Sequence, residues 1–84
     1  MNRNDIISEL KKIVSQITRI NISELSEDIL VREELGIDSL MAMEIVASCE
    51  KRLGIYIDEE QIFEIDTIGD FYNLIVKLYK EKTQ

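Results

Sequence analysis

Ser39 is the residue of this chain with the clearest capacity for chemistry. It lies three residues after Gly36 and one residue before Leu40, where an apolar segment begins. The glycine allows the loop to turn, and the apolar segment has helical spacing, so we expect the hydroxyl at the start of a helix. Such a hydroxyl can attack a substrate as a nucleophile, or it can accept a group that another enzyme attaches.

A nucleophilic role for Ser39 lacks its usual supporting residues. The chain contains no histidine, the base that most often takes the proton of a reactive serine. It also lacks the Gly-x-Ser-x-Gly sequence of the α/β-hydrolase elbow. A lysine base is the remaining variant. We therefore expect Ser39 to be an acceptor and the protein not to be an enzyme.

An acceptor serine must project into solvent, and the start of a helix tolerates an attached phosphodiester. The first turn has free N–H groups and the positive end of the helix dipole, which favour a phosphate even beside acidic residues. The alternative role for Asp38 and Ser39 is plain capping of the helix, for which both residue types are suited. The two residues alone do not separate these readings.

The elements around Ser39 are predicted from apolar spacing and capping residues. A first helix is capped by Asn4 or Asp5 and ends near Ile20, and a long connection follows from Asn21 to Gly36. A connection of this length is uncommon in a small domain and indicates function. The helix at Asp38 or Ser39 continues to Leu53, with Gly54 at its C-terminal cap.

Two further helices are predicted after Gly54. Asp58 and Gln61 mark the start of a short helix that reaches about Ile65, and Thr67 with Asp70 forms a capping box for the last one. The last helix has a stripe of apolar residues that we expect to be buried: Ile68, Phe71, Leu74, Ile75 and Leu78. The sequence thus predicts an all-α four-helix bundle, with a short third helix and a long first loop, in a single domain over residues 1–84.

The charge of the chain is concentrated in its middle. The formal net charge is −7, and residues 24 to 66 contain 13 acidic residues against Arg32, Lys51 and Arg52. An acidic surface repels nucleic acid and attracts basic surfaces of partner proteins. Ordinary solubility is an equally good explanation of the charge alone.

The composition excludes several kinds of site. Cys49 is the single cysteine, so the chain forms no internal disulfide, and its apolar helical context predicts a buried structural thiol. A zinc site would lack histidine and a cysteine pair, and no Asp-x-Asp-x-Asp-Gly calcium loop is present. No apolar run reaches 18 residues, and no secretory apolar segment begins the chain. We expect a cytoplasmic protein with no membrane contact.

Three segments together resemble the acyl carrier protein family, whose members carry 4'-phosphopantetheine on a serine. The first is Leu35-Gly36-Ile37-Asp38-Ser39-Leu40, and the others are Leu53 to Glu60 and Ile65 to Asp70. They occur in the family's order and spacing, and the resemblance covers the chain from about Ile6 to Leu78. It implies that Ser39 bears the arm, that Gly36, Asp38 and Leu40 belong to the attachment site, and that Asp38 offers a carboxylate to magnesium during arm transfer from coenzyme A.

The resemblance also implies partners: a phosphopantetheinyl transferase and acyl-loading and acyl-processing enzymes with basic docking patches. The helix after Ser39 has more apolar residues than one core face needs. The resulting docking patch comprises Leu40, Met41, Met43, Glu44 and Ala47. Two alternatives stay open: some of these residues pack under the first loop, or the protein is an unmodified helical module that only binds a partner.

The sequence departs from fatty-acid carriers at two places. Those carriers usually have an acidic residue directly after the leucine of Asp-Ser-Leu, where this chain has Met41, and Lys51 and Arg52 interrupt the acidic end of the helix. These departures favour a specialised polyketide-type or nonribosomal-peptide-type pathway over the housekeeping fatty-acid pathway. The interior of the bundle either shelters an acyl chain, as in some carriers, or is simply a packed core. A monomer is expected.

Overall fold

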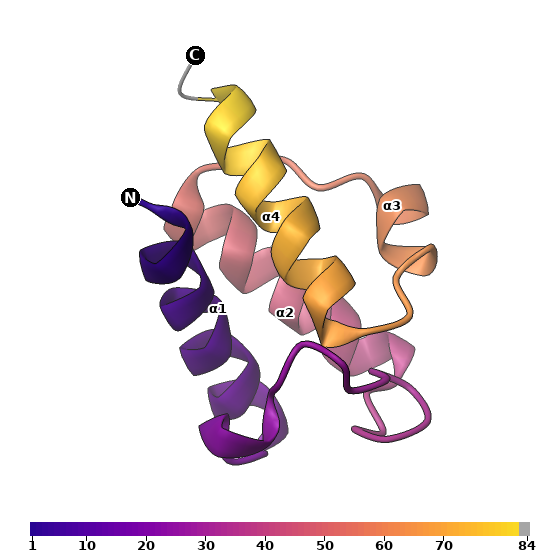
Figure 1. The fold of residues 1–84 in the computed structure, drawn as a ribbon. Helices are drawn as coiled ribbons and strands as arrows, with labels where there is room; N and C mark the ends of the chain where they lie inside the picture. The colour runs from indigo at the N-terminus through magenta and orange to yellow at the C-terminus, as the bar shows by residue number, and fades with distance from the viewer. Residues whose placement is uncertain (83–84) are drawn as a thin grey trace.

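The computed structural model describes residues 1–82, which form four α-helices and one short 3-10 helix (Figure 1). These elements are α1 (Arg3–Thr18), η1 (Ile22–Glu24), α2 (Ser39–Leu53), α3 (Glu59–Phe63) and α4 (Ile68–Lys82). Within residues 1–82 the only extended pairing is an isolated bridge between Leu30 and Thr67. The predicted all-α four-helix bundle, with a short third helix and a long first connection, is confirmed.

The boundaries of α1 differ from the prediction at both ends. Capping by Asn4 or Asp5 is wrong: the side chain of Asn2 accepts the N–H of Asp5 at 2.9 Å. Asp5 then lies in the first turn, where the helix dipole favours a negative charge. The helix ends at Thr18, before the predicted Ile20, because Arg19 has a left-handed conformation with a φ of 64°.

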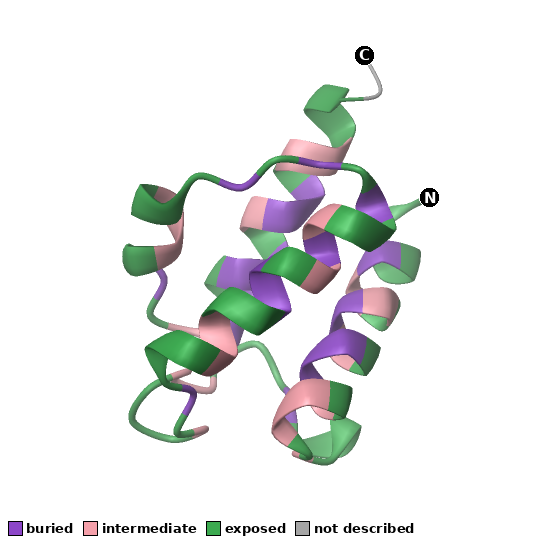
Figure 2. Cartoon of the chain, turned by 180° about the vertical axis from the view of Figure 1, so that it is seen from behind, coloured by how far each residue is buried: buried purple, intermediate pink, exposed green. Residues whose placement is uncertain are grey.

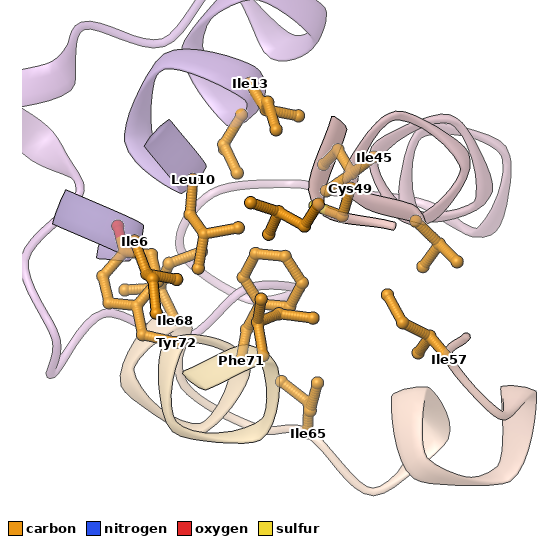
Figure 3. Close-up of a cluster of buried hydrophobic side chains, with 14 of the residues drawn as sticks. Ile6, Leu10, Ile13, Ile45, Cys49, Ile57, Ile65, Ile68, Phe71 and Tyr72 are labelled. Carbon is orange, nitrogen blue, oxygen red and sulfur yellow. The ribbon is translucent and has the colours of Figure 1, made fainter. Parts of the chain in front are cut away.

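The core lies between α1, α2 and α4, whose apolar faces turn toward one another (Figures 2 and 3). The buried helical residues are Ile6, Leu10, Ile13 and Val14 from α1, Ile45, Val46, Cys49 and Leu53 from α2, and Ile68, Phe71, Tyr72, Ile75 and Val76 from α4. The prediction for α4 missed Tyr72 and Val76, while Leu74 and Leu78 are only half-buried. None of the helices in residues 1–82 combines the length and hydropathy that spanning a bilayer requires.

Tyr72 places the one polar side-chain group of this core against the first connection. Its hydroxyl donates a hydrogen bond of 3.0 Å to the carbonyl of buried Leu25. Burial, with a smaller contribution from Glu27, raises the pKa of Tyr72 to about 12, so the hydroxyl stays protonated and keeps donating. The bond ties the start of the connection to the second turn of α4.

The first connection also pairs with the segment between α3 and α4. The Val31 N–H donates to the Asp66 carbonyl at 2.9 Å, and the Ile68 N–H donates to the Ile29 carbonyl at 2.9 Å. The guanidinium of Arg32 donates to the carbonyls of Phe63 and Ile65 at 3.2 and 3.0 Å. These bonds satisfy the polar backbone of two irregular segments, and they fix the position of α3 relative to the loop that precedes α2.

Side-chain caps start α3 and α4. The Thr67 hydroxyl accepts the N–H of Asp70, and the Asp70 carboxylate accepts the N–H groups of Asp66 and Thr67, each at 3.1 Å. The predicted capping box is thus confirmed, and these bonds lower the pKa of Asp70. At α3, Asp58 accepts the N–H of Glu60, and the helix ends at Phe63, so its predicted extension to Ile65 is wrong.

Gly69 allows α4 to start directly against the first connection. A Cβ at this position would lie 2.8 Å from the carbonyl oxygen of Glu27, which is backbone and has no free rotamer. Gly69→Ala should therefore lower the free energy of unfolding by about 1–2 kcal/mol, because the overpacking outweighs the better helix propensity of alanine.

Urea unfolding measures this difference, and Asn73→Ala is the matched control, since Asn73 is exposed on the same helix. The control should leave stability unchanged or slightly raised. An equally stable Gly69→Ala variant would contradict the close approach of the two segments.

Candidate functional site

Asp38 and Ser39 at the start of α2 have different roles. The Asp38 Oδ1 accepts the N–H of Met41 at 2.8 Å, so Asp38 is the N-cap. Ser39 is the first residue of the helix and is exposed, and its hydroxyl makes no hydrogen bond to any of residues 1–82. Helix capping therefore explains the presence of Asp38 at this position, as the sequence allowed. It does not explain the presence of Ser39.

The loop before α2 holds this hydroxyl outward. Ile37 is buried in the core, and its N–H donates to the Val31 carbonyl at 3.0 Å. Gly36 has a φ of 66°, which other residues adopt only with strain, and no atom lies within 4 Å of the place of its Cβ. The chain thus turns at Gly36, is anchored by Ile37, is capped by Asp38 and presents Ser39 to solvent.

The second carboxylate oxygen of Asp38 makes no hydrogen bond within residues 1–82, so it is available to a cation. No group of three or more metal-ligating side chains occurs in that part of the chain. A magnesium ion at Asp38 would consequently need its other ligands from a second protein or from a phosphate donor.

An apolar cavity of about 550 Å³ begins at the same place. Its lining includes Asp38, Ser39, Ala42 and Met43 at the start of α2, Glu59, Ile62 and Phe63 from α3, and, toward the core, Val14, Val31, Arg32, Ile37, Ile45, Val46, Ile65, Ile68 and Phe71. This volume lies within the range of small-ligand pockets. The exposed hydroxyl therefore borders a cavity that extends toward the centre of the bundle.

The predicted docking residues fall into two groups. Leu40 is 71% exposed and Met43 39% exposed, and Glu44 and Ala47 are exposed as well. Met41 is half-buried and packs against the core. Leu40, Met43, Glu44 and Ala47 thus form an open surface on α2, whereas Met41 is partly used in packing against the core.

Sequence reasoning missed Phe63 and Ile62. Both residues line the cavity, and Phe63 is 64% exposed at the end of α3. The sequence gives no clear signal here, because two adjacent apolar residues of a helix can both be buried, as Ile45 and Val46 are on α2. Here Ile62 is the one that packs against the core.

Cys49 is a structural residue, as predicted. Its side chain is fully buried on α2. Burial raises the pKa of the thiol to about 12; Arg52 lowers it and Glu50 raises it by smaller amounts. The thiol is protonated at neutral pH and is therefore a poor nucleophile.

Comparison with known proteins decides the family of this chain. Residues 8–75 match the family described as "Phosphopantetheine attachment site". An acyl carrier protein from Rhodococcus erythropolis is 35% identical over 79 residues, which span 94% of this chain and 87% of that protein. The chain belongs to the acyl carrier protein family.

Other relatives extend this result to specialised carriers and to structure. A meromycolate extension acyl carrier protein from Mycolicibacterium smegmatis is 32% identical over 82 residues, covering 98% of this chain and 83% of the relative. A solved acyl carrier protein from Enterococcus faecalis superimposes with a TM-score of 0.77 at 27% identity, over 93% of this chain and 99% of that one.

This acyl carrier protein carries acyl intermediates of a fatty-acid or polyketide-type pathway on a 4'-phosphopantetheine group. It acts with acyl-processing enzymes and is modified by a phosphopantetheinyl transferase. The start of α2 fits such a group: it has an exposed hydroxyl without a partner in residues 1–82, and the first N–H groups of a 15-residue helix lie beside it.

The different roles of Asp38 and Ser39 can be measured in the unmodified chain. Asp38→Ala should lower the free energy of unfolding by about 1 kcal/mol, because the N–H of Met41 loses its acceptor. Ser39→Ala should change it by less than about 0.5 kcal/mol, since no hydrogen bond is lost. Urea unfolding of the two variants measures both values, and equal losses would mean that Ser39 also caps the helix.

Proposed function

We propose that Ser39 is the attachment point of the 4'-phosphopantetheine arm. The observation that supports this assignment is the exposed Ser39 hydroxyl, which no residue from 1 to 82 hydrogen-bonds, beside a neighbour that performs the capping. When bound, the arm supplies a terminal thiol that holds an acyl group as a thioester. The chain itself positions the Ser39 hydroxyl that carries the arm. Gly36 and Ile37 shape the loop before it, and Leu40 begins the exposed face of α2.

Asp38 has a second role in this proposal, during arm transfer. Its Oδ1 keeps the helix cap, while the other oxygen takes part in binding the magnesium ion that accompanies coenzyme A. The enzyme and the phosphates of the donor provide the remaining ligands. The ion is transient, because residues 1–82 have no ligand cluster to retain it.

The protein itself performs no catalysis in this proposal and works as a single domain. Its partners dock on Leu40, Met41, Met43, Glu44 and Ala47 with basic patches, which the acidic middle of the chain attracts. A monomer in the cytoplasm remains the prediction from the sequence.

The pathway proposed is a specialised one of the polyketide or nonribosomal-peptide type. The supporting features are Met41, where a fatty-acid carrier usually has an acidic residue, and the basic pair Lys51 and Arg52 at the end of α2. Arg52 forms an ion pair with Glu9 of α1 at 3.6 Å, whereas exposed Lys51 pairs with no acidic residue in positions 1–82. This end of α2 therefore presents a positive charge to partners.

Loading of the arm tests the assignment of Ser39. Incubation with coenzyme A, magnesium and a broad-specificity phosphopantetheinyl transferase should raise the intact mass by one arm. Ser39→Ala should abolish this increase, because the accepting hydroxyl is gone. Ser48→Ala, which removes the other serine of α2, should load like the wild type.

The alternative, an unmodified helical interaction module, predicts no increase in mass in this loading experiment. Such a protein would take up no arm under these conditions, and its binding to a partner would be the same in wild type and Ser39→Ala. A wild-type chain that stays at its original mass would thus favour the alternative over the carrier.

The cavity supports the proposal that the bundle shelters part of the acyl chain. It borders Ser39 and is mainly apolar, so an attached chain could bury methylenes there at about 0.8 kcal/mol each. The acyl-loaded protein should then melt at a higher temperature than the same protein with a bare arm. Ala42→Leu, which fills part of the cavity, should reduce this difference.

Ala47→Leu is the matched control, since Ala47 is exposed on the same helix and does not line the cavity. It should leave the melting difference intact. Equal melting temperatures of the acylated and unacylated wild type would show that the chain stays outside the bundle.

A further inference from the structure

Residues 58–64, which contain α3, have few contacts with the rest of the fold. Figure 1 shows α3 at the edge of the bundle. None of these residues is buried, and Ile62 is the only one of them that packs against the core. A segment with so little buried surface can open locally while the core of a protein stays folded.

The residues that flank this segment are fixed, in contrast to the segment itself. Ile57 and Ile65 both have buried side chains. The Ile57 N–H donates to the Glu50 carboxylate at 2.9 Å, and the Ile65 carbonyl accepts a bond of 3.0 Å from the Arg32 guanidinium. Residues 58–64 thus run between two fixed ends, and we call them the lid.

The lid forms one wall of the cavity that borders Ser39. Glu59, Ile62 and Phe63 line the cavity from the lid, and Val46 is among the residues that line it from α2. Any movement of the lid therefore changes the access to this cavity.

One hydrogen bond joins the lid to a distant part of the chain. Within residues 1–82 it is the bond of 3.2 Å from the Arg32 guanidinium to the Phe63 carbonyl, and the other hydrogen bonds of the lid are local. The same Nη2 of Arg32 also donates to the Ile65 carbonyl, just outside the lid. One guanidinium thus bridges the last turn of the lid and the fixed end that follows it.

Arg32 can hold the lid because its own backbone is fixed. The Val31 N–H donates to the Asp66 carbonyl at 2.9 Å, and the Arg32 carbonyl accepts the N–H of Gly36 at 3.2 Å. The guanidinium is always charged, and hydrogen bonds from a charged donor are stronger than neutral ones. The bridge from Arg32 is therefore the strongest polar link between the lid and the first connection.

We propose that Arg32 is a latch that keeps the lid closed over the cavity, and that its release opens the cavity while the three long helices stay folded. Where the bundle shelters an acyl chain, Arg32 then limits the rate at which this chain enters and leaves. That consequence rests on the proposed function, whereas the latch itself is tested in the chain without an arm.

Thiol labelling of the unmodified chain tests the latch. Val46→Cys places a thiol on the cavity wall at a buried position, whereas the fully buried Cys49 does not line the cavity. Arg32→Met keeps an apolar stem and removes both hydrogen bonds. In the Val46→Cys chain it should raise the labelling rate at position 46 about tenfold, the size expected for the loss of charge-assisted hydrogen bonds.

The native thiol serves as an internal reference in the same chain. Cys49 is labelled only when the core unfolds, so its labelling rate should change little, and fragmentation by mass spectrometry separates the two sites. Arg32→Lys, which keeps a charged donor, should restore most of the slow labelling. Arg52→Met is the matched control, since Arg52 is exposed, pairs with Glu9 and does not line the cavity.

Amide hydrogen exchange gives the same comparison without Val46→Cys. The Ile65 N–H donates to the Ile62 carbonyl at 3.2 Å, a bond that joins the lid to its fixed end. Arg32→Met should raise its exchange rate about tenfold, while Arg52→Met should stay within twofold of the wild type.

Two outcomes would refute the latch. One is an equal labelling rate at position 46 in the Arg32→Met and Arg52→Met chains. The other is an equal increase at position 46 and at Cys49, because it would mean that Arg32 stabilises the whole fold. Either result leaves arm loading at Ser39 untouched, and a chain that takes up no arm can still show the latch.

Discussion

The site depends on one hydrogen bond, from the N–H of Met41 to the carboxylate of Asp38. A helix that begins at a surface needs an acceptor for its first N–H groups, and Asp38 supplies it from the residue just before α2. Because Asp38 meets this requirement, the Ser39 hydroxyl is not needed for the helix and stays free of partners in residues 1–82. A structural constraint met by one residue thus leaves its neighbour available for chemistry.

The rest of the bundle keeps this arrangement in place. The first connection has little regular structure, yet it is held by the buried Leu25 and Ile37, by the hydroxyl of Tyr72, and by its pairing with the segment before α4. The same pairing positions α3 through Arg32. The loop that turns into α2 and the helix that borders the cavity are therefore parts of one connected structure.

The sequence was informative where a local rule determines the structure. The Thr67 and Asp70 capping box, the start of α2 at Ser39 and the burial of Cys49 each follow from residue type and short-range spacing, and the structure confirms them. The resemblance of residues 35–40, 53–60 and 65–70 indicates the same family that residues 8–75 match.

Other features depend on contacts between distant segments, so the sequence could not provide them. Asp38 and Ser39 are both residue types that can cap a helix, and the folded structure shows that Asp38 makes the bond. The pairing of Leu30 with Thr67 joins residues far apart in the chain. The exposure of Phe63 depends on how the short α3 is held by the first connection, which the sequence of one helix cannot specify.

Peptide mapping of the loaded protein is the most direct measurement of the central claim. After arm transfer, proteolysis and fragmentation by mass spectrometry assign the added group to a single residue. The account predicts that the group lies on Ser39, and that the peptides containing the neighbouring Ser26 and Ser48 keep their original masses. An arm located on any other residue would contradict it.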